Sequence, residues 1–177
     1  MIRKIFIYGT IAGLIVGIPL SVMAITMHGQ DVAYGLVIGY TTMLIALSTV
    51  FIAVKRHRDL DLGGVIGFWP ALGLGLGISV VAGIFYVAAW ETALAVTHMD
   101  FAADYAKLMI AQKKASGVSG EALAKFVAEM DAFKAEYANP IYRFGMTFTE
   151  IFPVGVLVSL VTAALLRNSR FLPARRD

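Results

Sequence analysis

The sequence has no cysteine among its 177 residues and few charged residues, which make up 15% of the chain. The absence of cysteine excludes disulfides, thiolate metal sites and a thiol nucleophile. Three enzyme motifs are also missing: a nucleotide-binding glycine fingerprint, a nucleophile elbow and the paired-histidine helix of zinc proteases. We therefore expect neither an enzyme nor a bound cofactor, and we assign no catalytic residue.

Hydrophobic residues, by contrast, make up 59% of the chain, and the mean hydropathy is +0.77. Ordinary globular domains are about half apolar and about a quarter charged. Apolar runs of about 20 residues or more indicate membrane spans, and we expect four, at residues 5–27, 34–54, 71–96 and 144–166. The predicted fold class is all-α, an integral membrane four-helix bundle. A signal peptide is less favoured, because the first run exceeds the about 7–15 apolar residues of a secretory signal.

Basic residues gather at the ends of these runs, and the formal net charge is +3. Those at the span ends are Arg3, Lys4, Lys55, Arg56, Arg58, Arg167, Arg170, Arg175 and Arg176. The loop of residues 27–33 contains Asp31 and no lysine or arginine, and residues 98–143 carry six basic and six acidic residues. By the positive-inside rule, we expect both termini in the cytoplasm (N-in, C-in) and a location in the bacterial inner membrane. Charge placed at span ends also argues against a nucleic-acid partner.

The third apolar region, residues 62–97, is too long for one span. Its 36 residues would extend about 54 Å as a single helix, at about 1.5 Å per residue, against about 30 Å of hydrocarbon. Glycines cluster with Pro70 at its start, and proline favours the first turn of a helix. We expect residues 62–69 to lie along the cytoplasmic interface, with Trp69 and Trp90 near the two membrane interfaces.

Residues 98–143 are expected to form an extracytoplasmic helical hairpin. Two apolar stripes follow helical spacing there: Phe101, Tyr105, Leu108 and Met109 in the first, and Leu123, Phe126, Val127, Met130, Phe133 and Tyr137 in the second. A turn at residues 116–120 separates them, Ser119 is the expected N-cap of the second helix, and Pro140 follows its end. The stripes should face each other, unless one lies on the membrane or binds an extracytoplasmic protein partner. The chain is thereby divided into residues 1–97, 98–143 and 144–177.

Gly9, Gly13 and Gly17 recur every four residues on one face of the first span. Small residues at this spacing let two helix backbones approach closely in lipid. The pattern predicts either packing against another span of the same chain or a seam between two copies in a homodimer. We favour the first interpretation and keep the second open.

Two carboxyls lie inside the expected spans: Glu150 about two turns into the fourth, and Glu91 about one turn from the outer end of the third. With these boundaries they lie at similar depth. Because a carboxyl in the membrane is costly, we interpret both as candidates for binding a proton or a ligand, with His98 on the same side as a third. The alternative is that each accepts hydrogen bonds from neighbouring side chains and merely fixes the bundle. His28, His57 and His98 occur singly, so we expect no metal.

Seven stretches carry a family resemblance when they are taken together: Gly39–Ser48, Lys55–Asp59, Gly63-Gly64, Trp90-Glu91, Lys114–Gly117, Asn139-Pro140 and Thr147–Gly155. They resemble an uncharacterised bacterial membrane family, catalogued as domain of unknown function forty-one ninety-nine, over nearly the whole chain. The resemblance implies a small four-span inner-membrane protein and supplies no activity, substrate or catalytic residue. Glu91 and Glu150 fall within these stretches.

Two functional hypotheses follow. In the first, the protein has a structural or interaction role: the outer hairpin contacts a partner protein while the spans anchor the chain in the lipid bilayer. In the second, an oligomer of the chain is a small transporter or proton-linked permeation subunit in which Glu91 and Glu150 titrate. Four helices are few for a self-contained transport pathway, so we favour the first.

Overall fold

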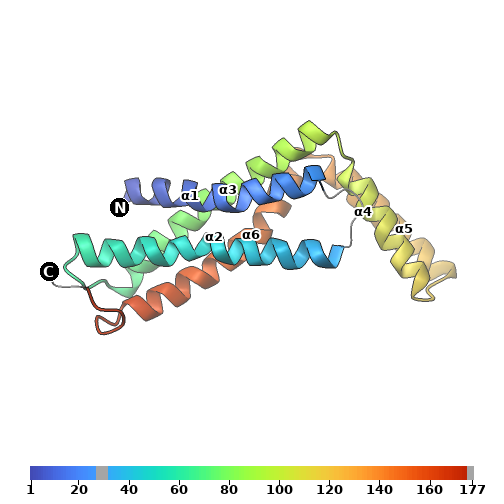
Figure 1. The fold of residues 1–177 in the computed structure, drawn as a ribbon. Helices are drawn as coiled ribbons and strands as arrows, with labels where there is room; N and C mark the ends of the chain where they lie inside the picture. Colours follow the sequence, from blue (N-terminus) through green and yellow to red (C-terminus); the bar gives the residue numbers. More distant parts are fainter. Residues whose placement is uncertain (27–31, 175–177) are drawn as a thin grey trace. The chain divides into compact units, whose positions relative to one another are not determined.

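The computed structural model describes residues 1–26 and 32–174, and every regular element in this part of the chain is an α-helix (Figure 1). The helices are α1 (Ile2–Thr26), α2 (Val32–Asp61), α3 (Phe68–Thr97), α4 (Phe101–Ala115), α5 (Gly120–Tyr137) and α6 (Pro140–Leu166). The predicted all-α fold is confirmed. His28 and Asp31 of the expected outer loop lie outside the described residues.

Four of the described helices, α1, α2, α3 and α6, are long and apolar enough to cross a membrane. Their membrane-compatible segments are Ile2–Ala24, Val37–Asp61, Phe68–Thr97 and Pro140–Leu166. The prediction of four spans is therefore confirmed at the level of length and composition.

The chain forms two compact units, and the first, which we call the bundle, comprises residues 1–93 and 147–177. In the bundle α1 and α3 run in one direction and α2 and α6 in the other (Figure 1). Its core is made of aliphatic side chains that are excluded from solvent, among them Leu47, Val50, Leu74, Ile78 and Ile151. Burial of aliphatic side chains at native packing density leaves little free volume between the helices.

One end of the bundle carries the basic residues, and we call it the basic end. Lys4 at the start of α1 pairs there with Asp61 at the end of α2. The helix α2 continues two turns beyond the expected boundary at residue 54. The helix α3 begins at Phe68 and so includes the last two residues of the segment expected at residues 62–69; the interfacial position of that segment stays a prediction.

A glycine turn makes this short connection feasible. Gly63 and Gly64 have φ of 62° and 92°, a left-handed conformation that side-chain-bearing residues rarely adopt. The Gly64 amide donates to the Arg58 carbonyl at 2.8 Å, which satisfies a carbonyl at the end of α2.

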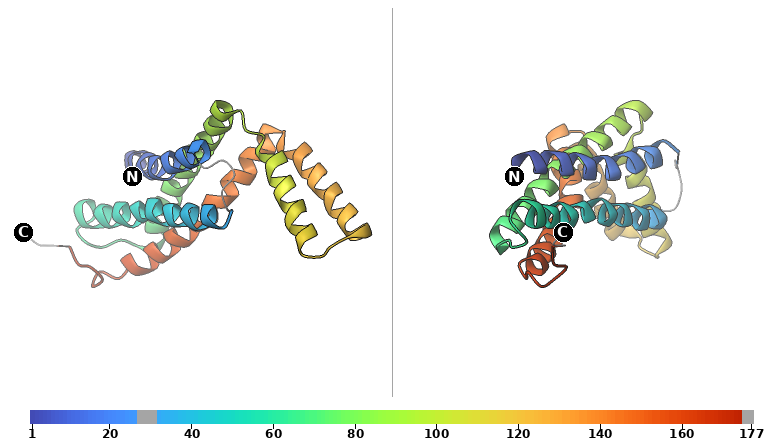
Figure 2. Two further views of the ribbon diagram at one scale, coloured as in Figure 1. Left: turned by 45° about the vertical axis from the view of Figure 1, so that its right-hand side comes forward. Right: turned by 60° about the vertical axis from the view of Figure 1, so that its left-hand side comes forward.

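The second unit, residues 94–146, contains the hairpin of α4 and α5 (Figure 2). The two apolar stripes face each other, as their spacing predicted: the rings of Phe101 and Tyr137 are 5.4 Å apart and those of Tyr105 and Phe133 are 5.6 Å apart. Such aromatic pairs stabilise a contact beyond the area they bury. Ser119 is the N-cap of α5, as expected, and its side chain makes no capping hydrogen bond.

Candidate functional site

Glu150 of α6 makes a polar contact with α3. The Tyr86 hydroxyl on α3 donates to Glu150 Oε2 at 3.0 Å. Tyr86 is 5% exposed, whereas Glu150 is exposed on the surface of the bundle. The pair therefore joins a buried phenol of α3 to an exposed residue of α6.

The position of Glu150 follows from a close crossing of α3 and α6. A Cβ added at Gly75 would lie 2.9 Å from Ser159 Cβ, and one added at Gly155 would lie 2.6 Å from Ser79 Cβ. Ser79 and Ser159 each donate to the glycine carbonyl four residues earlier, at 3.0 and 2.7 Å, and their hydroxyl oxygens are 3.4 Å apart. Small residues and hydroxyls of this kind hold membrane helices together, and here they fix an antiparallel register.

This register separates the two candidate carboxyls. Glu150 lies five residues before Gly155, so its level on antiparallel α3 is five residues beyond Ser79, near Ile84. Glu91 is a further seven residues along α3, about 10 Å at about 1.5 Å per residue. Counted along α3, the two carboxyls therefore differ in level, although similar levels were expected; their depth in a membrane stays a prediction.

Tryptophans suggest where the membrane boundaries fall along α3. Trp69 and Trp90 are 21 residues apart, which corresponds to about 32 Å of helix, close to the about 30 Å of a hydrocarbon core. Indoles are enriched at such boundaries. With Trp90 at one boundary, Glu91 lies at the interface, and the level of Glu150 lies about 9 Å inside.

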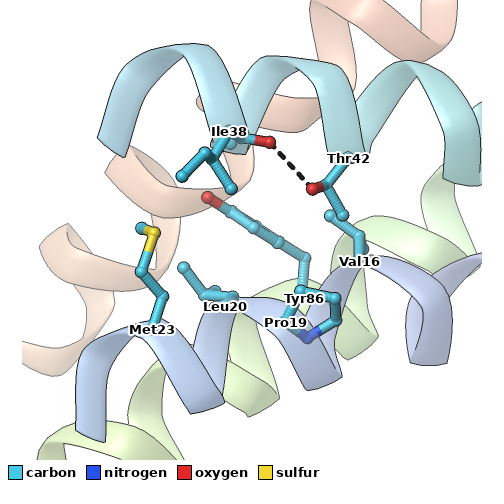
Figure 3. Close-up of a pocket in the computed structure, with 8 residues that line it drawn as sticks. Val16, Pro19, Leu20, Met23, Ile38, Thr42 and Tyr86 are labelled. Atoms are coloured by element: carbon cyan, nitrogen blue, oxygen red, sulfur yellow. Dashed lines mark hydrogen bonds between the residues drawn. The ribbon is translucent and has the colours of Figure 1, made fainter. Parts of the chain in front are cut away.

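Tyr86 also forms the base of a shallow apolar cleft between α1 and α2 (Figure 3). The cleft is lined by Val16, Pro19, Leu20, Met23, Ile38, Gly39, Thr42 and Tyr86. Its one side-chain hydroxyl besides that of Tyr86, on Thr42, donates to the Ile38 carbonyl at 2.8 Å within α2. Apolar lining with little polar functionality suits hydrocarbon rather than a charged solute.

His98 belongs to the second unit and adopts a turn conformation. It follows the end of α3 with φ of 51°, and histidine is among the residues that are enriched in this left-handed region. His57 lies 2.5 Å from Asp61 at the basic end of the bundle. In the described residues, no group of three histidine or acidic side chains is arranged to hold a metal ion.

The three glycines of α1 face α3. A Cβ added at Gly9 would lie 2.5 Å from Val81 Cβ, one at Gly13 would overlap Phe85 Cβ, and one at Gly17 would lie 3.0 Å from Ala89 Cβ. Successive partners are four residues apart in the same order, so the two helices run parallel in register. The glycine face is thus occupied within the chain, as the favoured interpretation of its spacing required.

Sequence reasoning missed Arg58, which it had counted only as a topological charge. Arg58 is 0% exposed and donates to the carbonyls of Phe171 at 2.9 Å and Leu172 at 2.6 Å, with a longer contact of 3.5 Å to Leu166. Its Nε also donates to Asp59 Oδ1 at 2.7 Å. Leu166 is the last residue of α6, and Phe171 and Leu172 lie beyond it, so Arg58 ties the end of α2 to the end of α6 and to the segment that follows. The only sign of this role in the sequence is that Arg58 is followed directly by the acidic residue Asp59.

A family model described as "Protein of unknown function (DUF4199)" matches residues 5–168. The match includes α1 from residue 5 onward, the other three apolar helices, the hairpin and both members of the Tyr86–Glu150 pair. No curated protein and no solved structure matches the chain.

Proposed function

Because the chain belongs to the DUF4199 family of proteins of unknown function, we propose a function from the geometry of its own residues. The protein is a four-span interaction protein of the bacterial inner membrane, with both termini in the cytoplasm. Its extracytoplasmic hairpin binds a partner protein. In this proposal the protein is not an enzyme, holds no cofactor and does not bind nucleic acid.

The observation that carries the proposal is the hairpin, a compact unit inserted between two apolar helices. Its aromatic side chains pack on one another, so the helices turn charged side chains outward: Asp104 is 63% exposed, Lys107 79% and Asp131 61%. A helical pair that is stabilised by its own core presents a rigid polar surface, and a rigid surface lowers the entropic cost of binding a protein.

The interior of the bundle supports an interaction role over transport. Its buried polar side chains, among the described residues, are Thr49, Arg58, Ser79, Thr147, Ser159 and Thr162. Thr49, Ser79 and Ser159 bond to carbonyls of their own helices. A pathway for solutes needs polar groups that converge on a passage. The second candidate function is an oligomeric transporter or proton-linked permeation subunit, and the Tyr86–Glu150 pair is the feature that favours it.

We expect photo-reactive residues placed at Lys107 and at Asp131 to crosslink the full chain in cells to one and the same partner protein. Both side chains point outward from the hairpin. The same residue placed at Arg56, which is exposed at the basic end, is the matched control and should not give that adduct. Adducts are identified by mass spectrometry. Recovery of the same partner after residues 100–138 are replaced by a flexible linker would refute the proposed role.

The absence of cysteine makes the proposed topology directly testable. In a Lys107→Cys variant we expect rapid labelling of intact cells by a membrane-impermeant maleimide, because the side chain is 79% exposed on the outer hairpin. Arg56→Cys should label only after the inner membrane is permeabilised, since Arg56 is exposed at the basic end. The wild-type chain, without cysteine, sets the background. Labelling of both variants in intact cells would contradict the N-in, C-in arrangement.

A further inference from the structure

Glu150 is an exposed residue of α6, one of the four helices that are long and apolar enough to cross a membrane. Its hydrogen-bond donor, the Tyr86 hydroxyl, is a neutral group. Carboxyls inside membranes are rarely exposed to lipid, and they characteristically pair with another polar or charged group. A cation at the level of Glu150 would complete the site.

The chain has no cation of its own at that level. Residues 5–27, 32–54, 59–97 and 144–166, which include all four expected spans, contain no lysine, arginine or histidine. A second copy would therefore bring another carboxyl and no counter-charge. The counter-charge has to come from a different molecule.

The depth of Glu150 below the membrane boundary indicates which kind of molecule can supply the counter-charge. The level of Glu150 lies about six residues inside Trp90, or about 9 Å of helix, which is below the headgroup region when Trp90 marks the boundary. A lipid amine sits in the headgroup region, whereas a basic side chain on a transmembrane helix can be held at any depth.

The surface of α6 beside Glu150 is an exposed apolar face against which another helix can pack. Pro153, Leu157 and Val161 follow Glu150 at intervals of three or four residues along α6 and are all exposed, Leu157 by 60% and Val161 by 50%. Positions at this spacing share one face of a helix. The face is apolar over three turns and ends in the carboxyl.

We propose that the Glu150 face of α6 binds a transmembrane helix of another protein, and that Glu150, held by Tyr86, pairs with a lysine or arginine of that helix. Tyr86 is a positioning residue, since its hydroxyl fixes one carboxyl oxygen and leaves the other to the partner. The inference rests on the proposed interaction role, but it uses the bundle and none of the hairpin.

The test uses the full chain in phosphatidylcholine vesicles, labelled with a donor dye through Asn168→Cys. Its probes are two leucine-rich transmembrane peptides that carry an acceptor dye and differ at one position six residues from one membrane boundary, lysine in one and leucine in the other. We expect energy transfer to report at least tenfold tighter association of the lysine peptide. Glu150→Gln should abolish this preference, and Tyr86→Phe should reduce it. Glu91→Gln, the matched control at the interface, should preserve it.

Equal association of the lysine and leucine peptides with the wild-type chain would overturn the inference, and so would an unchanged preference in Glu150→Gln. Weak, equal binding of the leucine peptide to wild type and Glu150→Gln, with equal helix content by circular dichroism, shows that the variant is folded. The peptides lack any extramembrane domain, so failure in this assay leaves the hairpin crosslinking result intact and separates this inference from the proposed function.

Discussion

Arg58→Ala will lower the free energy of unfolding by about 3 kcal/mol. The substitution removes the donors of the carbonyls of Phe171 and Leu172 and leaves a void where a fully buried side chain had been. Leaving one buried acceptor unsatisfied costs about 1–3 kcal/mol. The buried methylenes of the arginine side chain add a packing loss. Unfolding in mild detergent, followed by circular dichroism, measures the effect.

Arg58→Lys distinguishes this structural role from a topological one. Lysine preserves the charge that the positive-inside rule counts, so a purely topological residue would tolerate the change. A lysine ammonium lacks the planar fork of the guanidinium, and we expect it to lose about half of the Arg58 contribution, about 1.5 kcal/mol. Arg56→Ala, two residues earlier and exposed, should change stability by less than about 0.5 kcal/mol. Equal stability of Arg58→Lys and wild type would contradict the role assigned to Arg58.

Local patterns predicted the helices and the hairpin, because the physics that forms those elements acts over a few residues. The aromatic stripes of α4 and α5 recur at helical spacing, and a short glycine turn between them allows few arrangements other than an antiparallel pair. Apolar runs of sufficient length specify a span for a similar reason, since a helix in lipid satisfies its own backbone groups.

The sequence did not predict which helices contact one another or in what register. The spacing of Gly9, Gly13 and Gly17 identifies a face of α1, but not the helix that it meets. The depth of Glu150 relative to Glu91 depended on the crossing of Gly75 with Ser159, which no local pattern reveals. Arg58 was counted among the cytoplasmic charges, because the rule that assigns topology counts charges and carries no information about burial.

The difference between local patterns and contacts between helices also explains why the candidate site was predicted only in part. The sequence identified Glu150 from its cost in an apolar helix, but its donor Tyr86 is 64 residues away on α3. One aromatic residue in a long apolar span carries no sign of such a contact. Glu91 satisfied the same sequence criterion, yet it follows Trp90 directly. With Trp90 at a membrane boundary, Glu91 is interfacial, where the cost of a carboxyl is smaller and the case for a functional role is weaker.

Gly13→Ala should lower the free energy of unfolding by about 1–3 kcal/mol, the usual cost of overpacking an interior contact. The added Cβ would overlap the Cβ of Phe85, which belongs to the rigid base of that side chain and cannot rotate away. The helices α1 and α3 would have to separate, and the contacts of Gly9 with Val81 and of Gly17 with Ala89 would loosen with them. Steric trapping or thermal unfolding in bicelles measures the loss.

Gly73→Ala is the matched control for this prediction. Gly73 is also a helical glycine of a span, but a Cβ added there meets no described atom within 4 Å, so the substitution should not destabilise the protein and should add up to about 1 kcal/mol of stability through helix propensity. A swap tests the contact itself: in the Gly13→Ala and Phe85→Gly double variant the two backbones can again approach. We expect a coupling free energy of at least about 1 kcal/mol in the double-mutant cycle. Additive effects of the two substitutions would show that α1 and α3 do not meet at this pair, and would reopen the glycine face of α1 as a seam between two copies.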